Sequence, residues 1–342
     1  MLKIGVVGYG YWGPNLVRNF SELDGCKVSA VADLDPEKVA LVERRYPGLR
    51  ATTDVEGVIG DPAIDAVVIA TPVRTHFALA MQALRNGKDV WLEKPMTETA
   101  EQSRRLVDEA ARLGRLLHVD HTFVYTGAVR KIGEIIASGD LGQVLYYDAT
   151  RVNLGLFQHD VNVISDLAVH DFAILDHLLN ESPVAVTASG TSHYPGTPEN
   201  LAHVTLFYNS GSIAHIGVNW LAPVKVRQVL VGGSNKMIVY DDLNPSEKVK
   251  VYDTGVSFAT DPNQIHQMRV GYRTGDMWAP KLENAEALRY AAEHFVKCAL
   301  ARRPTLTAGE AGLRIVEIIE AATESMRGRG RTVRLQGAAV HA

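Results

Sequence analysis

Three glycines stand near the start of the chain at a spacing that leaves backbone N–H groups open to an anion. Residues 8–13 read Gly-Tyr-Gly-Tyr-Trp-Gly, between the pattern of a buried strand and the pattern of a helix. Gly8 permits a tight turn, Gly10 lets a pyrophosphate approach the backbone, and Gly13 allows the helix to pack closely on the strand. Glycines in such a turn can also be purely structural. The dinucleotide-binding residues predicted in this segment are Gly8, Gly10, Tyr11, Trp12 and Gly13.

An acidic residue at the end of the second strand pattern supports the dinucleotide interpretation. Asp33 lies 20 residues beyond Gly13, where a carboxylate accepts hydrogen bonds from the adenine ribose hydroxyls. A carboxylate repels a ribose 2′-phosphate, and no arginine adjoins Asp33, so NAD is favoured over NADP. Asp35, directly before Pro36, is interpreted as a helix cap, with sharing of the ribose as the alternative.

Two further segments follow strand patterns, at the sheet edge where open α/β sheets bind their ligands. Residues 70–76 read Ala-Thr-Pro-Val-Arg-Thr-His, and residues 91–96 read Trp-Leu-Glu-Lys-Pro-Met. A lysine at a strand end, fixed by a following proline, can act as a general acid or base once burial and cationic neighbours lower its pKa. Taken alone, Lys94 also fits a surface lysine.

Four segments together resemble the glucose–fructose oxidoreductase, inositol dehydrogenase and MocA family of nicotinamide-dependent sugar and cyclitol oxidoreductases. They are the glycine loop, the Thr-Pro…His and Glu-Lys-Pro segments, and Asp-Leu-Ala-Val-His at residues 166–170, in family order over nearly the whole chain. The resemblance implies that Lys94 lies by the nicotinamide and the substrate hydroxyl, and that Asp166 and His170 complete the site. The further cofactor-binding residues that we carry over are Thr71, Pro72, His76, Glu93 and Lys94.

The chemistry of Asp166 and His170 agrees with that assignment. The two residues are spaced i, i+4 on a predicted helix, so both project from one face. An imidazole of near-neutral pKa suits removal of a hydroxyl proton while a hydride leaves the same carbon. We therefore predict His170 as the general base, Lys94 as its hydrogen-bonding partner and proton relay, and Asp166 as a substrate orienter. A capped and solvated Asp–His pair is the alternative.

Two departures from the family pattern lie beside this pair. Residues 162–165, Asn-Val-Ile-Ser, stand where many relatives carry a glycine run, and Ala173 stands where relatives often have an acidic residue. Asp171 follows His170 directly instead. These changes leave the catalytic pair intact but affect the predicted pose of the substrate.

Less regular segments are predicted to select the substrate. Residues 151–160 are rich in hydrogen-bonding groups and lead into the helix of the catalytic pair. Lys225 and Arg227 would meet a phosphate or carboxylate, although alternating strand residues also form solvated faces. His121 and Tyr125 follow the last strand of the first domain, where the family often contacts substrate; core packing is the alternative for Tyr125. Beyond Asp166 and His170, the predicted substrate residues are His121, Tyr125, Arg151, Asn153, Phe157, Lys225 and Arg227.

The elements that must position these residues are indicated by hydrophobic periodicity. Up to residue 121, strand patterns alternate with helix patterns, which predicts a parallel βαβ series and a Rossmann domain over residues 1–121. Predicted strands are 3–8, 27–32, 66–70, 89–92 and 116–119; one predicted helix, 98–112, has Thr97 or Thr99 as its cap and Gly114 as its end.

Beyond residue 121 the pattern changes. Helix patterns at 127–138 and 166–179 precede five strand patterns, and two more helix patterns close the chain. Residues 122–342 are predicted to form an α+β domain that binds substrate, and the resemblance implies a large, open, mostly antiparallel sheet that forms dimers or tetramers. The strands are 184–191, 202–208, 212–218, 226–231 and 237–240, and the last helices are 283–301 and 309–326.

Composition narrows the class of protein. The 342 residues carry a formal net charge of −4, which gives no global basic field for nucleic acid or anionic lipid. Cys26 and Cys298 have no partnered spacing, so neither a disulfide framework nor a thiolate zinc site is expected. The chain shows neither an export signal nor an apolar run of ~18 residues, so a cytoplasmic protein without a membrane partner is expected.

Two histidine-containing groups raise the question of a metal. The first is His118, Asp120 and His121, and the second joins residues 159–160 to His170. Strand alternation sends His121 to the opposite face from the other two members of its group, and no recognised ligand spacing occurs. The redox interpretation needs no metal, so none is predicted.

These observations predict NAD-dependent oxidation, or the reverse reduction, of a ring secondary alcohol. Residues 10–20 and 153–158 look like the branch of the family found in saccharide biosynthesis, where a C3 hydroxyl is commonly oxidised ahead of an aminotransferase. The expected substrate is a sugar, amino sugar, aminoglycoside, nucleotide sugar or cyclitol, in polysaccharide or antibiotic biosynthesis. The alternatives are an NAD-assisted glycoside hydrolase of the same family and a non-catalytic NAD(H)-binding regulator.

Overall fold

The chain forms two compact units in a computed structural model that describes residues 1–155, 161–253, 255–258 and 270–335. The first unit comprises Met1–Tyr125 and Ala285–Glu320. The second comprises Thr126–Asn284 and Ala321–Ala342. The chain therefore leaves the first unit and returns to it, whereas the prediction placed every residue after 121 in one C-terminal domain.

The first unit is built on a six-stranded, all-parallel sheet in the order β3-β2-β1-β4-β5-β6. This is the strand order of doubly wound dinucleotide-binding folds, and it reverses between β1 and β4, where such sheets bind their ligands at the carboxyl ends of the strands. The strands are β1 (Leu2–Val7), β2 (Cys26–Ala32), β3 (Arg50–Thr52), β4 (Ala66–Ile69), β5 (Asp89–Glu93) and β6 (Leu117–Asp120).

Helices connect these strands, and their first and last residues are flanked by residue types that favour helix caps. Thr99 accepts a hydrogen bond from the backbone N–H of Gln102 at 3.2 Å, and Gly114 closes the same helix in the left-handed conformation, both as predicted. The helices are α1 (Gly13–Ser21), α2 (Pro36–Arg45), α3 (Val55–Ile59), α4 (Val73–Arg85), α5 (Ala100–Leu113), the 3-10 turn η1 (Thr122–Tyr125), α9 (Ala287–Ala301) and α10 (Gly309–Arg327), which ends in the second unit.

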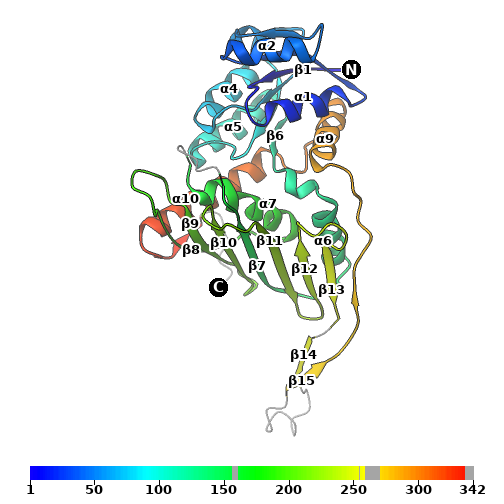
Figure 1. The fold of residues 1–342 in the computed structure, drawn as a ribbon, viewed down its shortest axis with the longest axis vertical. Helices are drawn as coiled ribbons and strands as arrows, with labels where there is room; N and C mark the ends of the chain where they lie inside the picture. The colour runs from blue at the N-terminus through cyan, green and yellow to red at the C-terminus, as the bar shows by residue number, and fades with distance from the viewer. Residues whose placement is uncertain (156–160, 254, 259–269, 336–342) are drawn as a thin grey trace. The chain divides into compact units, whose positions relative to one another are not determined.

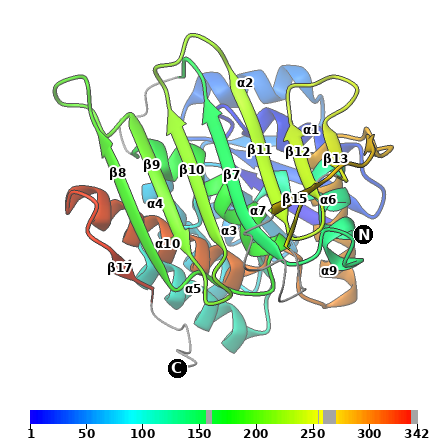
Figure 2. The same ribbon diagram turned by 90° about the horizontal axis from the view of Figure 1, so that it is seen from below.

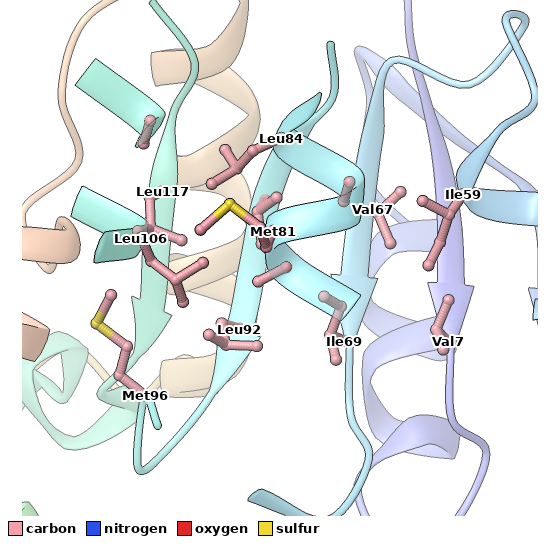
Figure 3. Packing of buried hydrophobic residues seen from close by; sticks show 14 of the residues in the cluster. Val7, Ile59, Val67, Ile69, Met81, Leu84, Leu92, Met96, Leu106 and Leu117 are labelled. Atoms are coloured by element: carbon pink, nitrogen blue, oxygen red, sulfur yellow. The ribbon is translucent and has the colours of Figure 1, made fainter. Parts of the chain in front are cut away.

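Aliphatic side chains fill one face of this sheet. Met81 of α4 points toward Leu117 of β6, and the cluster extends along the sheet to Ile59 of α3 and Val7 of β1 (Figure 3). The middle strand β4 is buried throughout, as expected for a parallel strand covered on both faces. This core holds the carboxyl ends of β1, β4 and β5 in fixed positions.

Aromatic side chains fill the other face. Trp91 of β5 contacts Phe20 of α1 and Phe295 of α9, with ring centroids 5.3 and 5.6 Å apart. The helices α1 and α9 lie side by side (Figure 1). Because Phe295 comes from the returning segment, residues 285–320 complete the core of the first unit.

The second unit is built on a nine-stranded sheet in the order β16-β13-β12-β11-β7-β10-β9-β8-β17 (Figure 2). Its described pairs are antiparallel except β7 with β10, which confirms the mostly antiparallel sheet. The strands are β7 (Val144–Val152), β8 (Ala185–Thr191), β9 (Leu201–Phe207), β10 (Ile213–Asn219), β11 (Val226–Gly233), β12 (Met237–Asp241), β13 (Val249–Tyr252), β16 (Met277–Trp278) and β17 (Val333–Arg334).

Helices cover one face of this sheet and leave the other open. Tyr147 and Ala149 of β7 are buried, whereas their neighbours Tyr146 and Asp148 are half-buried, so burial alternates along the strand. The covering elements are α6 (Gly127–Ala137), the π-helical turn η2 (Ile164–Ala168) and α7 (Val169–Leu178). A separate two-stranded sheet pairs β14 (Gly255–Phe258) with β15 (Val270–Arg273).

The central strand β7 was not among the predicted strands. Residues 144–152 read Val-Leu-Tyr-Tyr-Asp-Ala-Thr-Arg-Val, with polar residues at positions that the structure places on both faces. The buried position of Arg151 hides the alternation that identifies a strand with one covered face. No helix among residues that the structure describes is long and apolar enough to cross a membrane.

Candidate functional site: a dinucleotide cradle and two groups of candidate catalytic residues

The glycine loop follows β1 and opens α1, as predicted. A Cβ on Gly8 would lie 2.5 Å from the Ala70 carbonyl oxygen, and Gly8 has φ +96°, so glycine is required there. A Cβ on Gly13 would lie 2.3 Å from the Gly8 carbonyl oxygen. At Gly10 a Cβ would meet nothing within 4 Å, which leaves room for a pyrophosphate to approach the backbone. Trp12 caps α1 without a side-chain hydrogen bond, so the loop fits a dinucleotide phosphate.

Asp33 is half-buried and joined to the glycine loop. Its Oδ2 accepts a hydrogen bond from the Tyr9 N–H at 2.6 Å, and its Oδ1 accepts one from the Asp35 N–H at 2.9 Å. These contacts fix the carboxylate at the end of β2, where a ribose hydroxyl would donate to it. The Asp35 side chain accepts from the Glu37 N–H at 2.8 Å, which confirms its interpretation as a helix cap.

Replacing Asp33 by alanine is expected to weaken binding of NADH about tenfold or more, because a hydrogen bond to a charged group contributes about 1.5–3 kcal/mol. Binding of NADPH should weaken less, since its 2′-phosphate is repelled by the carboxylate of the natural protein. Fluorescence titration with both nucleotides measures the ratio. The control is Asp35→Ala, which should lower the unfolding temperature and leave the ratio unchanged. A ratio that changes only in Asp35→Ala would move ribose recognition to Asp35.

His76 joins two of the predicted cofactor segments. It is 1% exposed, with Nε2 2.8 Å from the Thr71 carbonyl oxygen and Nδ1 3.1 Å from the Pro95 carbonyl oxygen. Burial lowers the pKa of its imidazole, so the ring is neutral and has one N–H to donate. The structure therefore places His76 between the turn after β4 and the turn after β5, where it positions both.

Lys94 is half-buried at the carboxyl end of β5, the same edge of the sheet as the glycine loop. The preceding Glu93 is buried and pairs in register with Asp120 at the end of β6. Burial, and then the charge of Asp120, raises the pKa of Glu93 well above its usual range. The carboxyl of Glu93, predicted to contact the cofactor, thus faces a second carboxyl instead.

Among the remaining predicted residues of the first unit, Tyr11 and Pro72 are exposed and Thr71 is half-buried, whereas the predicted substrate residues His121 and Tyr125 are buried. Tyr125 is 5% exposed, and its ring lies 5.6 Å from that of His294, which supports core packing. His118 lies against Trp91 with ring centroids 4.2 Å apart. His121 is 1% exposed, and its pKa is lowered to about 3 by burial and then by the charge of Lys94. Over the described part of the chain, no group of three His, Cys, Asp or Glu side chains is arranged to hold a metal.

Asp166 lies in a π-helical turn, not in the α-helix predicted over residues 166–179. Its Oδ2 accepts a hydrogen bond from the indole Nε1–H of Trp220 at 3.1 Å. The Asn162 side-chain oxygen accepts from the Ser165 N–H at 3.1 Å and so supports the start of the turn. Asn162 thus has a capping role that a glycine in its place would lack. The prediction of one continuous α-helix is therefore wrong at its start.

His170 lies half-buried in the first turn of α7, directly before a buried ion pair. Arg151 Nε donates to Asp171 Oδ2 at 2.8 Å, and the Tyr147 hydroxyl donates to Asp171 Oδ1 at 3.0 Å. Arg151 is 3% exposed, so its predicted substrate contact is corrected: it joins β7 to α7 beside His170. An arginine in a strand gave no signal of a buried partner, because that partner lies on a helix further along the chain.

The other predicted substrate residues of the second unit are less constrained. Lys225 is exposed in the connection between β10 and β11, and Arg227 pairs with Asp242 at 3.4 Å. Asn153 is half-buried beside Asn219, to whose carbonyl its N–H donates at 3.2 Å. Phe157 lies outside the described residues.

Comparison with known proteins settles the relationship. The model of an oxidoreductase family with an NAD-binding Rossmann fold matches residues 2–121, and that of the GFO/IDH/MocA C-terminal domain matches residues 129–239. The chain belongs to the GFO/IDH/MocA family. This confirms the resemblance, the α/β fold class with its Rossmann domain, and NAD as the cofactor.

A curated relative of this GFO/IDH/MocA chain, inositol 2-dehydrogenase 2 of Saccharopolyspora erythraea, is 32% identical over 55% of this chain and 56% of its own length. An inositol 2-dehydrogenase of Rhodococcus jostii is 30% identical over 64% of this chain and 61% of its own. The chain thus matches little more than half the length of these relatives. A solved structure of levoglucosan dehydrogenase with NADH and levoglucosan superposes with a TM-score of 0.83 at 21% identity, covering 98% and 99% of the two chains.

Sequence reasoning did not identify Trp220 as a neighbour of the candidate site residue Asp166 in this GFO/IDH/MocA protein. It is 1% exposed and reaches Asp166 from beyond the end of β10, 54 residues along the chain. We expect Trp220→Phe to lower kcat/KM about tenfold, because the indole N–H donates a hydrogen bond worth about 1.5–3 kcal/mol to a carboxylate. Steady-state kinetics measures this. The control Trp278→Phe, at the exposed strand β16, should keep full activity. Equal rates in both variants would remove Trp220 from the site.

Proposed function

We propose that the protein is an NAD-dependent oxidoreductase that converts a ring secondary hydroxyl of a carbohydrate or cyclitol to a ketone, or runs the reverse reduction. The observation that carries the proposal is the placement of Lys94 at the sheet edge that also bears the glycine loop and Asp33. A cofactor held by that loop has its reacting end near the carboxyl ends of the strands. The relatives named inositol 2-dehydrogenase act on a cyclitol of this kind.

Each residue of the proposed site has one task in this reaction. When bound, NAD supplies the acceptor for the hydride. His170 takes the hydroxyl proton, Lys94 donates a hydrogen bond to the same oxygen and relays the proton, and Asp166, fixed by Trp220, orients the substrate. Hydride and proton leave one carbon and its oxygen, so the alcohol becomes a ketone and the charge is balanced.

The finer proposal is oxidation at C3 of a pyranose carried by a nucleotide sugar, an amino sugar or an aminoglycoside, in polysaccharide or antibiotic biosynthesis. It rests on the likeness of residues 10–20 and 153–158 to the saccharide-biosynthesis branch of the family. The proposal includes a cytoplasmic location. It also includes assembly into a dimer or tetramer through the open face of the nine-stranded sheet, which the mass of the protein in solution tests.

A substrate panel tests the proposal. Purified protein and NAD are mixed with nucleotide sugars, aminoglycosides, methyl glycosides and inositols, and NADH absorbance and the mass of any ketone are followed. We expect NADH and a ketone from one class, and neither from a Lys94→Met blank. Free sugar without net NADH would favour an NAD-assisted hydrolase. NADH binding without turnover on any member would favour a regulator.

A further inference from the structure

Two carboxyl groups outside the proposed catalytic set are buried next to one another in the first unit. Glu93 ends β5 and Asp120 ends β6, and the two residues are paired in register across these parallel strands. They are 7% and 2% exposed, and their side chains share a hydrogen bond. Register partners on parallel strands are about 4.8 Å apart along the hydrogen-bonding direction, which brings the two carboxyl groups together.

The two carboxyl groups have different surroundings. The Thr122 hydroxyl donates to Asp120 Oδ1 at 2.7 Å, which favours the ionised form of Asp120. Glu93 Oε1 is buried without a hydrogen-bond partner among the residues that the structure describes. Burial raises the pKa of Asp120 to about 6, and burial followed by the charge of Asp120 raises that of Glu93 further above its usual range. The proton that the pair retains at neutral pH therefore lies on Glu93, and the negative charge lies on Asp120.

The groups that face this pair leave Lys94 as its only positive neighbour within the described part of the first unit. Lys94 directly follows Glu93, and its charge acts on both carboxyl groups. His121 is neutral, because burial and then Lys94 lower its pKa to about 3, and both of its buried ring nitrogens have no partner among described residues. Tyr125 is also neutral, because burial raises its pKa.

We propose that Glu93 and Asp120 form a dyad that holds one proton and one negative charge at neutral pH and serves as the counter-charge that positions Lys94. The inference rests on the proposed function of Lys94. Glu93 and Asp120 act through Lys94 and are positioning residues, so no bond to the substrate forms or breaks at either. The dyad keeps one unit of negative charge opposite the lysine while a hydroxyl proton is transferred.

Infrared spectroscopy tests the shared proton without any substrate. At neutral pH the natural protein should show the C=O stretching band of a protonated carboxyl group, and Glu93→Gln should lose it. The control is Glu98→Gln, which removes an exposed carboxyl five residues further along and should keep the band. Absence of the band from the natural protein, or its survival in Glu93→Gln, would overturn the dyad.

The pH profile of kcat tests the counter-charge. As pH falls through about 6, Asp120 gains a proton and the dyad becomes neutral, so the rate of the natural protein should fall. In Asp120→Asn the pair can carry a negative charge only after Glu93 has lost its proton. Burial keeps the pKa of Glu93 raised, so the acidic limb of the profile should move to higher pH. The rate at pH 7 should fall about tenfold, as for the loss of a hydrogen-bonded charge.

Glu93→Gln separates the dyad from general damage to the fold. Glutamine keeps the shape and the hydrogen-bond donor of a protonated Glu93 and leaves Asp120 ionised. Glu93→Gln should therefore lose less kcat than Asp120→Asn, and its acidic limb should stay at the pH of the natural protein. Equal losses at equal unfolding temperatures, or an unmoved limb in Asp120→Asn, would overturn the proposal. If the substrate panel gives no turnover, the proposed function fails. The infrared result alone then decides whether Glu93 and Asp120 share a proton.

Discussion

Replacing His170 by alanine is expected to lower kcat about 10²- to 10⁴-fold, the range that a general acid–base group contributes. Binding of NADH should stay within about twofold, because the glycine loop and Asp33 belong to the first unit and His170 to the second. Steady-state rates with the panel substrate and NADH fluorescence measure the two quantities. Added imidazole should restore part of the rate, since it replaces the lost base.

The matched control is His177→Ala, which removes a second half-buried histidine from the same helix α7. It should keep the rate of the natural protein. If His170→Ala retained more than a tenth of the rate, the general base would have to be another group. A rate loss of the same size in both variants would indicate damage to α7 and not to the chemistry.

Replacing Lys94 by methionine, which keeps length and removes the charge, is expected to lower kcat about 10³-fold. Lys94→Arg should also be slow, because a guanidinium stays protonated and cannot relay a proton. Rates and NADH binding are measured as for His170. The control Lys27→Met removes an exposed lysine from β2 and should leave both unchanged.

The double variant of Lys94 and His170 tests whether both serve one proton transfer. If they act as a unit, the double variant should lose little more than the worse single variant, since effects within one catalytic unit are far from additive. Losses that multiply would show independent roles. A Lys94→Met protein with the rate of the natural protein would contradict the assignment outright.

Local signals in the sequence were sufficient to predict much of the first unit. The glycine spacing, the cap at Thr99 and the left-handed end at Gly114 depend on a few neighbouring residues, and each of these features is found in the structure. The return of residues 285–320 to this unit was not predictable in this way. The amphipathic pattern of α9 shows that one of its faces packs on another element, but the partner of Phe295 is Trp91, more than two hundred residues earlier.

The site shows the same limit. The glycine loop could be identified from its spacing, whereas the roles of Lys94, Asp166 and His170 were predicted from the resemblance of four segments to a known family. The π-turn at Asp166 could not be predicted in this way; in the structure the Asn162 side chain accepts from the Ser165 N–H, and the distant Trp220 donates to the Asp166 carboxylate. Arg151 was assigned to substrate because residues 151–160 are rich in hydrogen-bonding groups; its buried ion pair with Asp171 reverses that inference.

The discontinuous first unit has a consequence for synthesis of the protein on the ribosome. Its aromatic face is unfinished until Phe295 has been made, so Phe20 and Trp91 stay uncovered while residues 126–284 of the second unit are translated. Exposed apolar surface in a partly folded domain promotes aggregation. The first 125 residues must therefore avoid association with other chains until Phe295 has been made. A fragment that stops at residue 125 would carry the same uncovered surface permanently.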